Sequence, residues 1–206
     1  EFAARAAADG SVIAMGNDVL YEDGDTRVSP MRRLLTRVGL RSVACICAKS
    51  KVIADALRTL GVQGRVEINY WGSDLRQFRP SDRAEARREL GLLDMGPIVL
   101  SPRAVEPLYN IQLIVEALAE VAKRRPEAQL VIIGRANPQY LAKVAEAVDR
   151  LGLRDRVRFV GEIPYAELPT WYRASDIVVS VARVEGFPNT VLEVMACGVP
   201  VLVGET

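Results

Sequence analysis

The sequence predicts an α/β fold built on doubly wound parallel sheets. Short apolar runs alternate with amphipathic stretches along the chain, which is the order of strands and helices in such folds. The run QLVIIG at residues 129–134 is almost continuously apolar, as expected of a parallel strand that helices cover on both faces. Half of the 206 residues are hydrophobic and 26% are charged, which is typical of a globular protein.

Residues 1–70 form the first predicted unit. Its opening residues, EFAARAAADG, have the pattern of a helix. Two further helices are expected, each ending near a glycine, at residues 31–40 and 49–61. Strands are expected at residues 11–15, 42–48 and 65–70. The stretch at 71–80 lacks periodicity and ends in Pro80, so it predicts an interdomain linker.

The alternation restarts in a second predicted unit at residues 81–206. Strands are expected at residues 97–101, 129–134, 156–161, 176–181 and 200–203. Helices are expected at residues 82–92, 110–125, 140–152, 166–175 and 190–198. The helix at 110–125 has its apolar residues at the spacing of one face, and Pro169 is expected to break the helix at 166–175 early. The sequence opens without methionine and stops just after a strand pattern, so we expect a fragment with both units incomplete.

Several classes of function are disfavoured by composition. The chain has no histidine, which excludes a histidine general base, a Ser-His-Asp triad and histidine-ligated metal sites. A net charge of +1 does not indicate a nucleic-acid binder. Cys45 and Cys47 alternate along one strand and are expected to be reduced core residues in a cytoplasmic protein. No apolar run approaches the roughly 18 residues of a membrane span, and no signal peptide opens the sequence.

The stretch EGFPNTVLEVMACGVPV places two acids, Glu185 and Glu193, around the start of a predicted helix. One interpretation is structural. Thr190 would be the N-cap and Glu193 the N3 residue of a capping box, and Glu185 would be a loop acid. The other interpretation is functional, because ligands of doubly wound sheets bind where strands end and helices begin.

The functional interpretation predicts a nucleotide sugar as the ligand. Free amides at the helix start attract a diphosphate, and Gly186 lets the backbone approach a ligand closely. Carboxylates repel phosphate, but they accept hydrogen bonds from the hydroxyls of a sugar. The pattern therefore places the diphosphate on the amides and one acid on each of the two sugars.

The same stretch resembles the E-x7-E signature of retaining glycosyltransferases of family 4, and several other segments resemble this family in the same order. INYWGSDLRQFRP at 68–80 is similar to the family's interdomain segment, and SPRAVEPLYNIQLIVEAL at 101–118 to the opening of its donor domain. LVIIG, RVRFVGEIP and WYRASDIVVS follow in the family's order. The resemblance implies a GT-B fold of two Rossmann-like domains. The acceptor-side domain would end at residue 70, and the nucleotide-sugar donor domain would cover 81–206.

The resemblance implies a role for each matching residue. Glu185 would contact the donor sugar and Glu193 the ribose, while Arg103 would bind phosphate. Ile163 would pack against the nucleobase. The diphosphate or sugar would meet backbone amides around Gly186, Phe187, Asn189 and Thr190.

Three positions depart from the family pattern. Tyr109 and Asn110 stand where the family usually has a lysine followed by a glycine, so one cation for the leaving diphosphate is missing. Arg183, two residues before Glu185, is a candidate replacement. Met15 stands where many relatives have a histidine near the acceptor.

The resemblance implies a chemistry without metal and without a cofactor. A sugar would move, with retention of configuration, from a nucleoside-diphosphate sugar to an acceptor such as a glycan or a lipid-linked precursor. Arg103 and helix amides would stabilise the leaving diphosphate, and no protein group is assigned as general base. The enzyme would be cytoplasmic, with peripheral contact to the inner membrane surface.

Other interpretations stay open. A nucleotide-sugar epimerase of the same fold is one, although the absence of histidine is unfavourable to it. An inactive nucleotide-binding relic is another, favoured by Tyr109. Gly134-Arg135-Ala136 is a weak phosphate-loop signal or a plain strand-to-helix turn. The arginines at 27, 32, 33, 37 and 41 predict a solvated basic helix or a surface for anionic membranes.

Overall fold

The computed structural model describes residues 3–5, 11–15, 29–40 and 43–205. These residues form two compact units. The first comprises the described residues up to Gly72 together with Val184–Pro188, and the second comprises Ser73–Arg183 together with the residues from Asn189 onward. The residues predicted as a linker are thus divided between the units, and the acceptor and donor roles of the two domains stay predictions.

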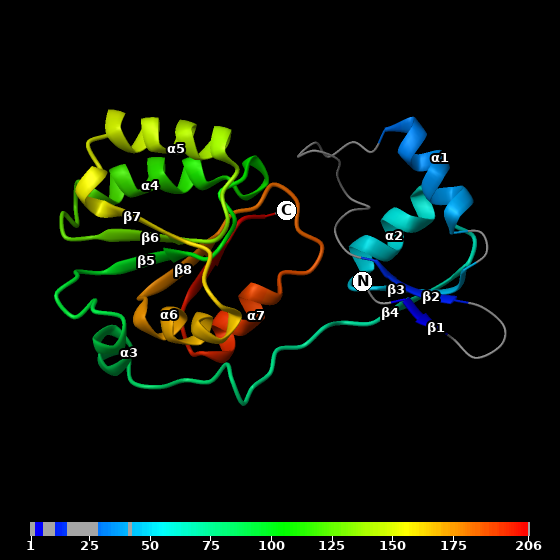
Figure 1. Cartoon of the computed structure of the whole chain (residues 1–206), viewed down its shortest axis with the longest axis horizontal. Helices are drawn as coiled ribbons and strands as arrows, with labels where there is room; N and C mark the ends of the chain where they lie inside the picture. Colours follow the sequence, from blue (N-terminus) through cyan, green and yellow to red (C-terminus); the bar gives the residue numbers. More distant parts are fainter. Residues whose placement is uncertain (1–2, 6–10, 16–28, 41–42, 206) are drawn as a thin grey trace. The chain divides into compact units, whose positions relative to one another are not determined.

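The first unit contains a four-stranded sheet in the order β1-β2-β3-β4 (Figure 1). Its parallel strands are β2 (Ser11–Met15), β3 (Val43–Ala48) and β4 (Arg65–Ile68). Its helices are α1 (Pro30–Gly39) and α2 (Lys51–Thr59), and α2 starts at Ser50, whose hydroxyl accepts a hydrogen bond from the Ile53 amide. A core of buried residues that includes Ile46, Ile53 and Leu57 lies between α2 and the sheet.

The helix predicted at the opening of the chain is wrong for residues 3–5. Ala3–Arg5 form strand β1, which pairs antiparallel with β2. Pairing with a neighbouring strand overrides the helical preference of an alanine-rich segment, because intrinsic propensity is a weak determinant beside tertiary hydrogen bonds. The rest of that predicted helix, at 1–2 and 6–10, lies outside the described residues.

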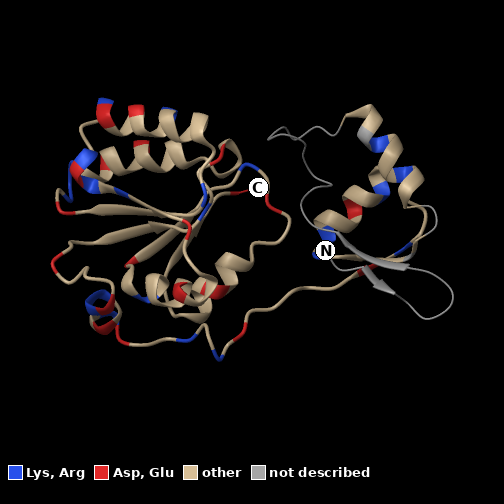
Figure 2. Cartoon of the chain, viewed as in Figure 1, with Lys and Arg blue, Asp and Glu red and all other residues tan. Residues whose placement is uncertain are grey.

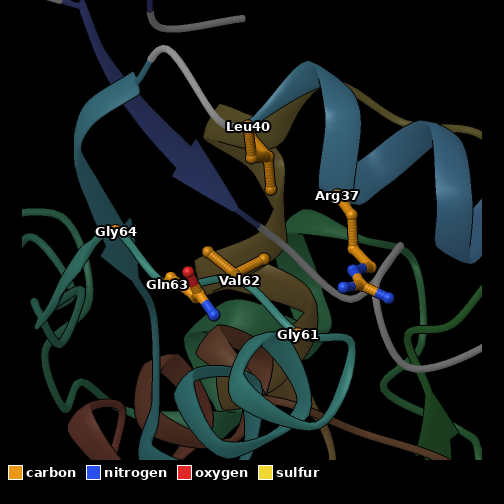
Figure 3. Close-up of a pocket in the computed structure, with 6 residues that line it drawn as sticks. All are labelled: Arg37, Leu40, Gly61, Val62, Gln63 and Gly64. Carbon is orange, nitrogen blue, oxygen red and sulfur yellow. The ribbon is translucent and has the colours of Figure 1, made fainter.

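Helix α1 is basic and carries no acidic residue (Figure 2). Its last turn packs on the turn that joins α2 to β4. Gly61 has a φ of +86°, and a Cβ there would lie 2.9 Å from Nε of Arg37. Arg37, Leu40 and residues 61–64 line a small pocket of about 280 Å³ (Figure 3). The residues that line this pocket come just before β3 and β4 in the sequence, so the pocket lies at the amino ends of these strands. Ligands of doubly wound sheets bind at the opposite edge, where the strands have their carboxyl ends.

The second unit contains a five-stranded parallel sheet in the order β7-β6-β5-β8-β9. Its strands are β5 (Ile98–Ser101), β6 (Gln129–Ile133), β7 (Val157–Gly161), β8 (Ile177–Ser180) and β9 (Val201–Val203). Its α-helices are α3 (Arg83–Glu89), α4 (Ile111–Ala122), α5 (Pro138–Arg150), α6 (Leu168–Ala174) and α7 (Asn189–Ala196). Short 3-10 helices lie at Pro107–Tyr109, Arg154–Arg156 and Tyr165–Glu167. The predicted α/β class with parallel sheets is confirmed.

Helices cover both faces of this sheet, α4 and α5 on one and α3, α6 and α7 on the other (Figure 1). Strand β6 shows why its sequence is continuously apolar. Leu130 and Ile132 pack toward α4 and α5, whereas Val131 and Ile133 pack in the opposite core. Both faces are therefore buried, as in other parallel sheets.

Two details of the helices differ from prediction. Pro169 does not break α6; the helix begins at Leu168, so the proline lies in the first turn, where its missing N–H costs no hydrogen bond. Helix α7 begins at Asn189, one residue before the predicted N-cap Thr190. Among the described residues, no helix is long and apolar enough to cross a membrane.

Candidate functional site

The strand order of the second unit reverses between β5 and β8. The chain leaves β5 toward β6 on one side, and returns later to place β8 on the other side. In open parallel sheets the carboxyl ends of two such strands form the ligand-binding crevice. The segments that follow β5 and β8, and the start of α7, therefore define the candidate site.

Arg103 follows β5 and is held at the end of β8. Its Nε donates a hydrogen bond to Oγ of Ser180 at 2.9 Å, and its guanidinium lies 5.2 Å from the centre of the Tyr109 ring. A cation over an aromatic face is attracted by the ring quadrupole. These contacts orient a half-buried positive charge at the switch point of the sheet.

The backbone at Arg103 depends on Gly134. This glycine follows β6 with a φ of +141°, and a Cβ there would lie 3.0 Å from the carbonyl carbon and oxygen of Arg103. The amide of Val105 also donates to the Arg135 carbonyl at 2.8 Å. Gly134-Arg135-Ala136 therefore serves as a strand-to-helix turn that supports the Arg103 loop.

Asn110 fixes a second arginine at this edge. It has a φ of +51°, a left-handed conformation that asparagine adopts more readily than most residues. Its Nδ2 donates to the Val181 carbonyl at 3.0 Å, and its Oδ1 accepts from Nε of Arg183 at 2.9 Å. The Arg183 amide donates to the Leu108 carbonyl at 2.8 Å. From the sequence, Asn110 was noted only as a departure from the family pattern. The structure shows that its side chain positions Arg183.

Glu193 lies on α7 with only 6% of its surface exposed. Its Oε1 accepts a hydrogen bond from the Tyr165 hydroxyl at 2.7 Å, and its Oε2 accepts one from the Tyr172 hydroxyl at 3.1 Å. Burial and then the hydrogen bond to Glu193 raise the pKa of Tyr165 to about 12. Burial also raises the pKa of Tyr172. Glu193 is thus a buried acceptor satisfied by two phenols.

The capping-box interpretation is not supported. Both carboxylate oxygens of Glu193 bond to tyrosine hydroxyls, and Thr190 lies inside α7 rather than at its N-cap. The partners of Glu193 therefore lie on other elements and not at the start of its own helix. Tyr165 and Tyr172 were not predicted as site residues.

The remaining predicted residues lie at the entrance of α7 and beyond β7. Ile163 is half-buried against the core that contains Tyr172, and Asn189 and Thr190 open α7. Oδ1 of Asn189 is buried without a hydrogen-bond partner among the described residues. The structure thus brings Arg103, Tyr109 and Arg183 together after β5 and β8, whereas Glu193 is bonded to Tyr165 and Tyr172.

The loop between β8 and α7 carries the other predicted residues. Glu185, Gly186 and Phe187 belong to the segment Val184–Pro188, which forms part of the first unit. The Phe187 ring lies 5.8 Å from the Tyr70 ring, and Gly186 is buried. Met15, predicted near the acceptor, is in β2, where only its backbone is described.

No cluster of three or more potential metal ligands lies in the described part of the chain. The cationic groups placed at the switch point are arginines, which suit phosphate because the guanidinium presents several N–H donors in a fixed plane. Arg103, Arg183 and the start of α7 have the chemistry to bind an anion, and the Glu193 carboxylate has the chemistry to accept a hydrogen bond from a hydroxyl.

Comparison with known proteins identifies the family of the chain. The family model of glycosyl transferases group 1 matches residues 82–206. D-inositol 3-phosphate glycosyltransferase 2 of Catenulispora acidiphila is 35% identical over 160 residues, covering 72% of this chain and 37% of that protein. The lipopolysaccharide core biosynthesis mannosyltransferase LpsB of Rhizobium meliloti is 38% identical over 158 residues, covering 73% and 44%.

Solved structures share the fold. Anabaena Alr3699/HepE, in complex with UDP and glucose, superposes with a TM-score of 0.80 at 24% identity, covering 93% of this chain and 52% of that one. Sucrose-phosphate synthase from Thermosynechococcus elongatus superposes with a TM-score of 0.78 at 27% identity, covering 93% and 49%. These neighbours are GT-B glycosyltransferases.

The chain spans about half the length of the proteins it matches, or less. Because the family model covers more than half of its residues, this chain belongs to the glycosyl transferases group 1 family.

Proposed function

We propose that the protein is a retaining glycosyltransferase of family 4, with Glu185 and Glu193 as its E-x7-E motif, which uses a nucleoside-diphosphate sugar as donor. The observation that carries the proposal is the buried Glu193 carboxylate on α7, in the same unit whose switch point carries Arg103 and Arg183. Membership of the family supports it. So does the presence of UDP and glucose in the complex of the fold neighbour HepE.

Each part of the donor has a group of matching chemistry. Glu193 accepts hydrogen bonds from the ribose hydroxyls, and Ile163 packs on the nucleobase. The amides at Asn189 and Thr190 meet the diphosphate together with Arg103 and Arg183, because helix N-termini and guanidinium groups both favour phosphate oxygens. Glu185, with the backbone of Gly186 and Phe187, contacts the transferred sugar.

Catalysis then consists of stabilising the leaving group. As the bond from the anomeric carbon to the diphosphate oxygen breaks, negative charge grows on the diphosphate, and Arg103 and Arg183 stabilise that charge in the transition state. Tyr109 contributes indirectly by holding the Arg103 guanidinium. No metal or cofactor takes part, because the arginines and helix amides supply the positive field.

The acceptor is a glycan or a lipid-linked precursor. The names of two relatives give D-inositol 3-phosphate and a lipopolysaccharide core as their substrates or products, which supports a polyol or sugar acceptor. In the transfer, the acceptor hydroxyl oxygen bonds to the anomeric carbon on the face that the diphosphate leaves, and the departing diphosphate oxygen takes the proton of that hydroxyl.

The surface of α1 supports peripheral membrane contact. Met31, Leu34, Leu35 and Val38 follow one another at the spacing of one helix face and are 54–72% exposed. Arg33 and Arg37 lie on the same helix, which has no acidic residue (Figure 2). An exposed apolar face with adjoining arginines fits an anionic lipid surface at the cytoplasmic side of the membrane.

Calorimetric titration with UDP, GDP and ADP tests the donor site. The folded 206-residue chain is expected to bind one of them, and Glu193→Ala is expected to weaken that binding by about 10–100-fold, the worth of hydrogen bonds to a charged group. Glu146→Ala is the matched control, because Glu146 is an exposed glutamate on α5. A folded chain that binds none of the three contradicts the proposal.

A second assay separates the alternatives. A transferase releases nucleoside diphosphate only when an acceptor is present. An epimerase of the same fold instead converts the donor sugar without any acceptor. An inactive relic binds nucleotide and releases nothing, and Tyr109 in place of a cation is the feature that favours it.

A further inference from the structure

The two tyrosines on Glu193 differ in how firmly they are held. Tyr172 lies on α6 with 1% of its surface exposed, and its ring stacks 6.0 Å from Phe78 inside the core. Tyr165 lies in the short 3-10 helix Tyr165–Glu167 and is 56% exposed. Its ring meets Phe78 edge-on at 5.5 Å, and the rest of it faces solvent. One partner of the carboxylate is therefore fixed, and the other is free to rotate away.

A buried carboxylate needs hydrogen bonds in every state of the protein. If such a group loses a hydrogen-bond partner and gains no other, the folded state is destabilised by the full desolvation free energy of that group. Tyr165 supplies the hydrogen bond on Oε1, the shorter of the two at 2.7 Å. A ligand hydroxyl that reaches Glu193 meets this oxygen already occupied.

We propose that the Tyr165 hydroxyl is an exchangeable stand-in for a ligand hydroxyl, which leaves Oε1 of Glu193 when nucleotide binds. This inference rests on the proposed function, in which Glu193 accepts the ribose hydroxyls. The exchange replaces one O–H···O bond by another, so the carboxylate stays satisfied before and after binding. Tyr165 thereby stabilises the empty site and competes with the donor nucleotide.

The surroundings of Tyr165 favour this exchange. The residue follows Ile163 by two positions on the connection from β7 to α6, so it lies next to the surface proposed for the nucleobase. Its backbone carbonyl accepts a hydrogen bond of 3.4 Å from Nε2 of Gln77, which holds the main chain while the side chain rotates. Tyr172 has no comparable freedom, since its departure would empty the centre of a packed core.

Competition predicts opposite effects on stability and on affinity. In Tyr165→Phe the empty protein loses one hydrogen bond to Glu193, so its melting temperature falls. The nucleotide no longer displaces a phenol, so its dissociation constant falls by roughly 5–10-fold. Tyr172→Phe is the matched control. It also lowers the melting temperature, because it removes the other hydrogen bond to Glu193. It does not raise the affinity for nucleotide, because the phenylalanine ring still fills the core position of Tyr172 and opens no room for a ligand hydroxyl.

The experiment titrates UDP, GDP and ADP, each beside its 2′,3′-dideoxy analogue, into the wild-type chain, Tyr165→Phe and Tyr172→Phe. The expected gain in Tyr165→Phe appears with the ribonucleotide and vanishes with the dideoxy analogue, which has no hydroxyl to place on Glu193.

Other results overturn the inference. Equal gains with both analogues would show that Tyr165 obstructs the site without competing for Glu193. Weaker binding by Tyr165→Phe would show that the hydroxyl contacts the nucleotide. In both cases the wild type still binds and the proposed function survives. Absence of binding by the wild type and by both folded variants rejects the proposed function and the exchange together.

Discussion

Among single residues, Asn110 contributes both a backbone conformation and two side-chain hydrogen bonds to the candidate site. It takes the left-handed conformation that starts α4, ties that start to the end of β8, and holds Nε of Arg183. A glycine would adopt the same φ without strain, but it would make neither side-chain contact. The side chain of Asn110 therefore positions the Arg183 guanidinium, and its backbone conformation allows α4 to begin at the next residue.

Asn110→Gly separates these two roles. We expect the fold to persist and the affinity for nucleoside diphosphate to fall by about 3–10-fold, because each lost hydrogen bond is worth about 1 kcal/mol. Arg183→Ala should weaken binding at least as much. In the Arg183→Ala background, Asn110→Gly should add little, since coupled residues are non-additive. Additive losses in calorimetric titrations would mean that Asn110 acts independently of Arg183.

Tyr165 is expected to make the stability of the folded protein fall at alkaline pH. Its pKa is about 12 when folded, raised by burial and by Glu193, against a usual value of about 10. Between these values the folded state binds more protons than the unfolded state, so stability falls as the pH rises from 10 to 12. Tyr165→Phe should lose less stability over that window. Urea unfolding at both ends, with absorbance at 295 nm to follow phenolate formation, measures this; equal losses would show that Tyr165 does not contribute.

At the scale of elements, the periodicity of apolar residues correctly predicted the helices and strands whose formation depends on their own sequence. The helices at 110–125 and 140–152 and the strand at 129–134 were predicted because their apolar residues repeat at one spacing. Strand β1 was missed because it is formed by pairing with β2, and no local sequence pattern predicts that pairing. Glu193 was identified from sequence, but its partners lie 28 and 21 residues away on other elements, and no local pattern records them.

Helix α1 provides a prediction about an element as a whole. Leu34→Asp combined with Leu35→Asp should reduce binding to phosphatidylglycerol vesicles by at least tenfold, because each leucine contributes about 1.5–3 kcal/mol when buried. Binding to phosphatidylcholine should be weak throughout, and salt should reduce the anionic component. Leu93→Asp, an exposed leucine of the second unit, is the control. Vesicle co-sedimentation that is unaffected by the α1 variant would exclude this helix as the contact.

At the scale of the whole molecule, the spacing of the two glutamates crosses from one compact unit to the other. Glu185 lies in the segment that belongs to the first unit, and Glu193 lies on α7 of the second. In the proposed function, the nucleotide-binding role therefore belongs to the unit with the five-stranded parallel sheet. The proposed sugar-binding role belongs to a loop whose aromatic residue, Phe187, packs near Tyr70.

This division predicts separable losses for the two acids. Glu193→Gln should weaken the nucleoside diphosphate and the nucleotide sugar equally, since both contain the ribose. Glu185→Gln should leave the diphosphate within about twofold, while removing the extra affinity that the sugar adds, of order 1 kcal/mol for one charged hydrogen bond. Titrations of UDP against UDP-glucose, and of GDP against GDP-mannose, measure the difference. If Glu185→Gln weakens the bare diphosphate as strongly as Glu193→Gln does, the two acids act on the same part of the donor, and their assignment to two different sugars is wrong.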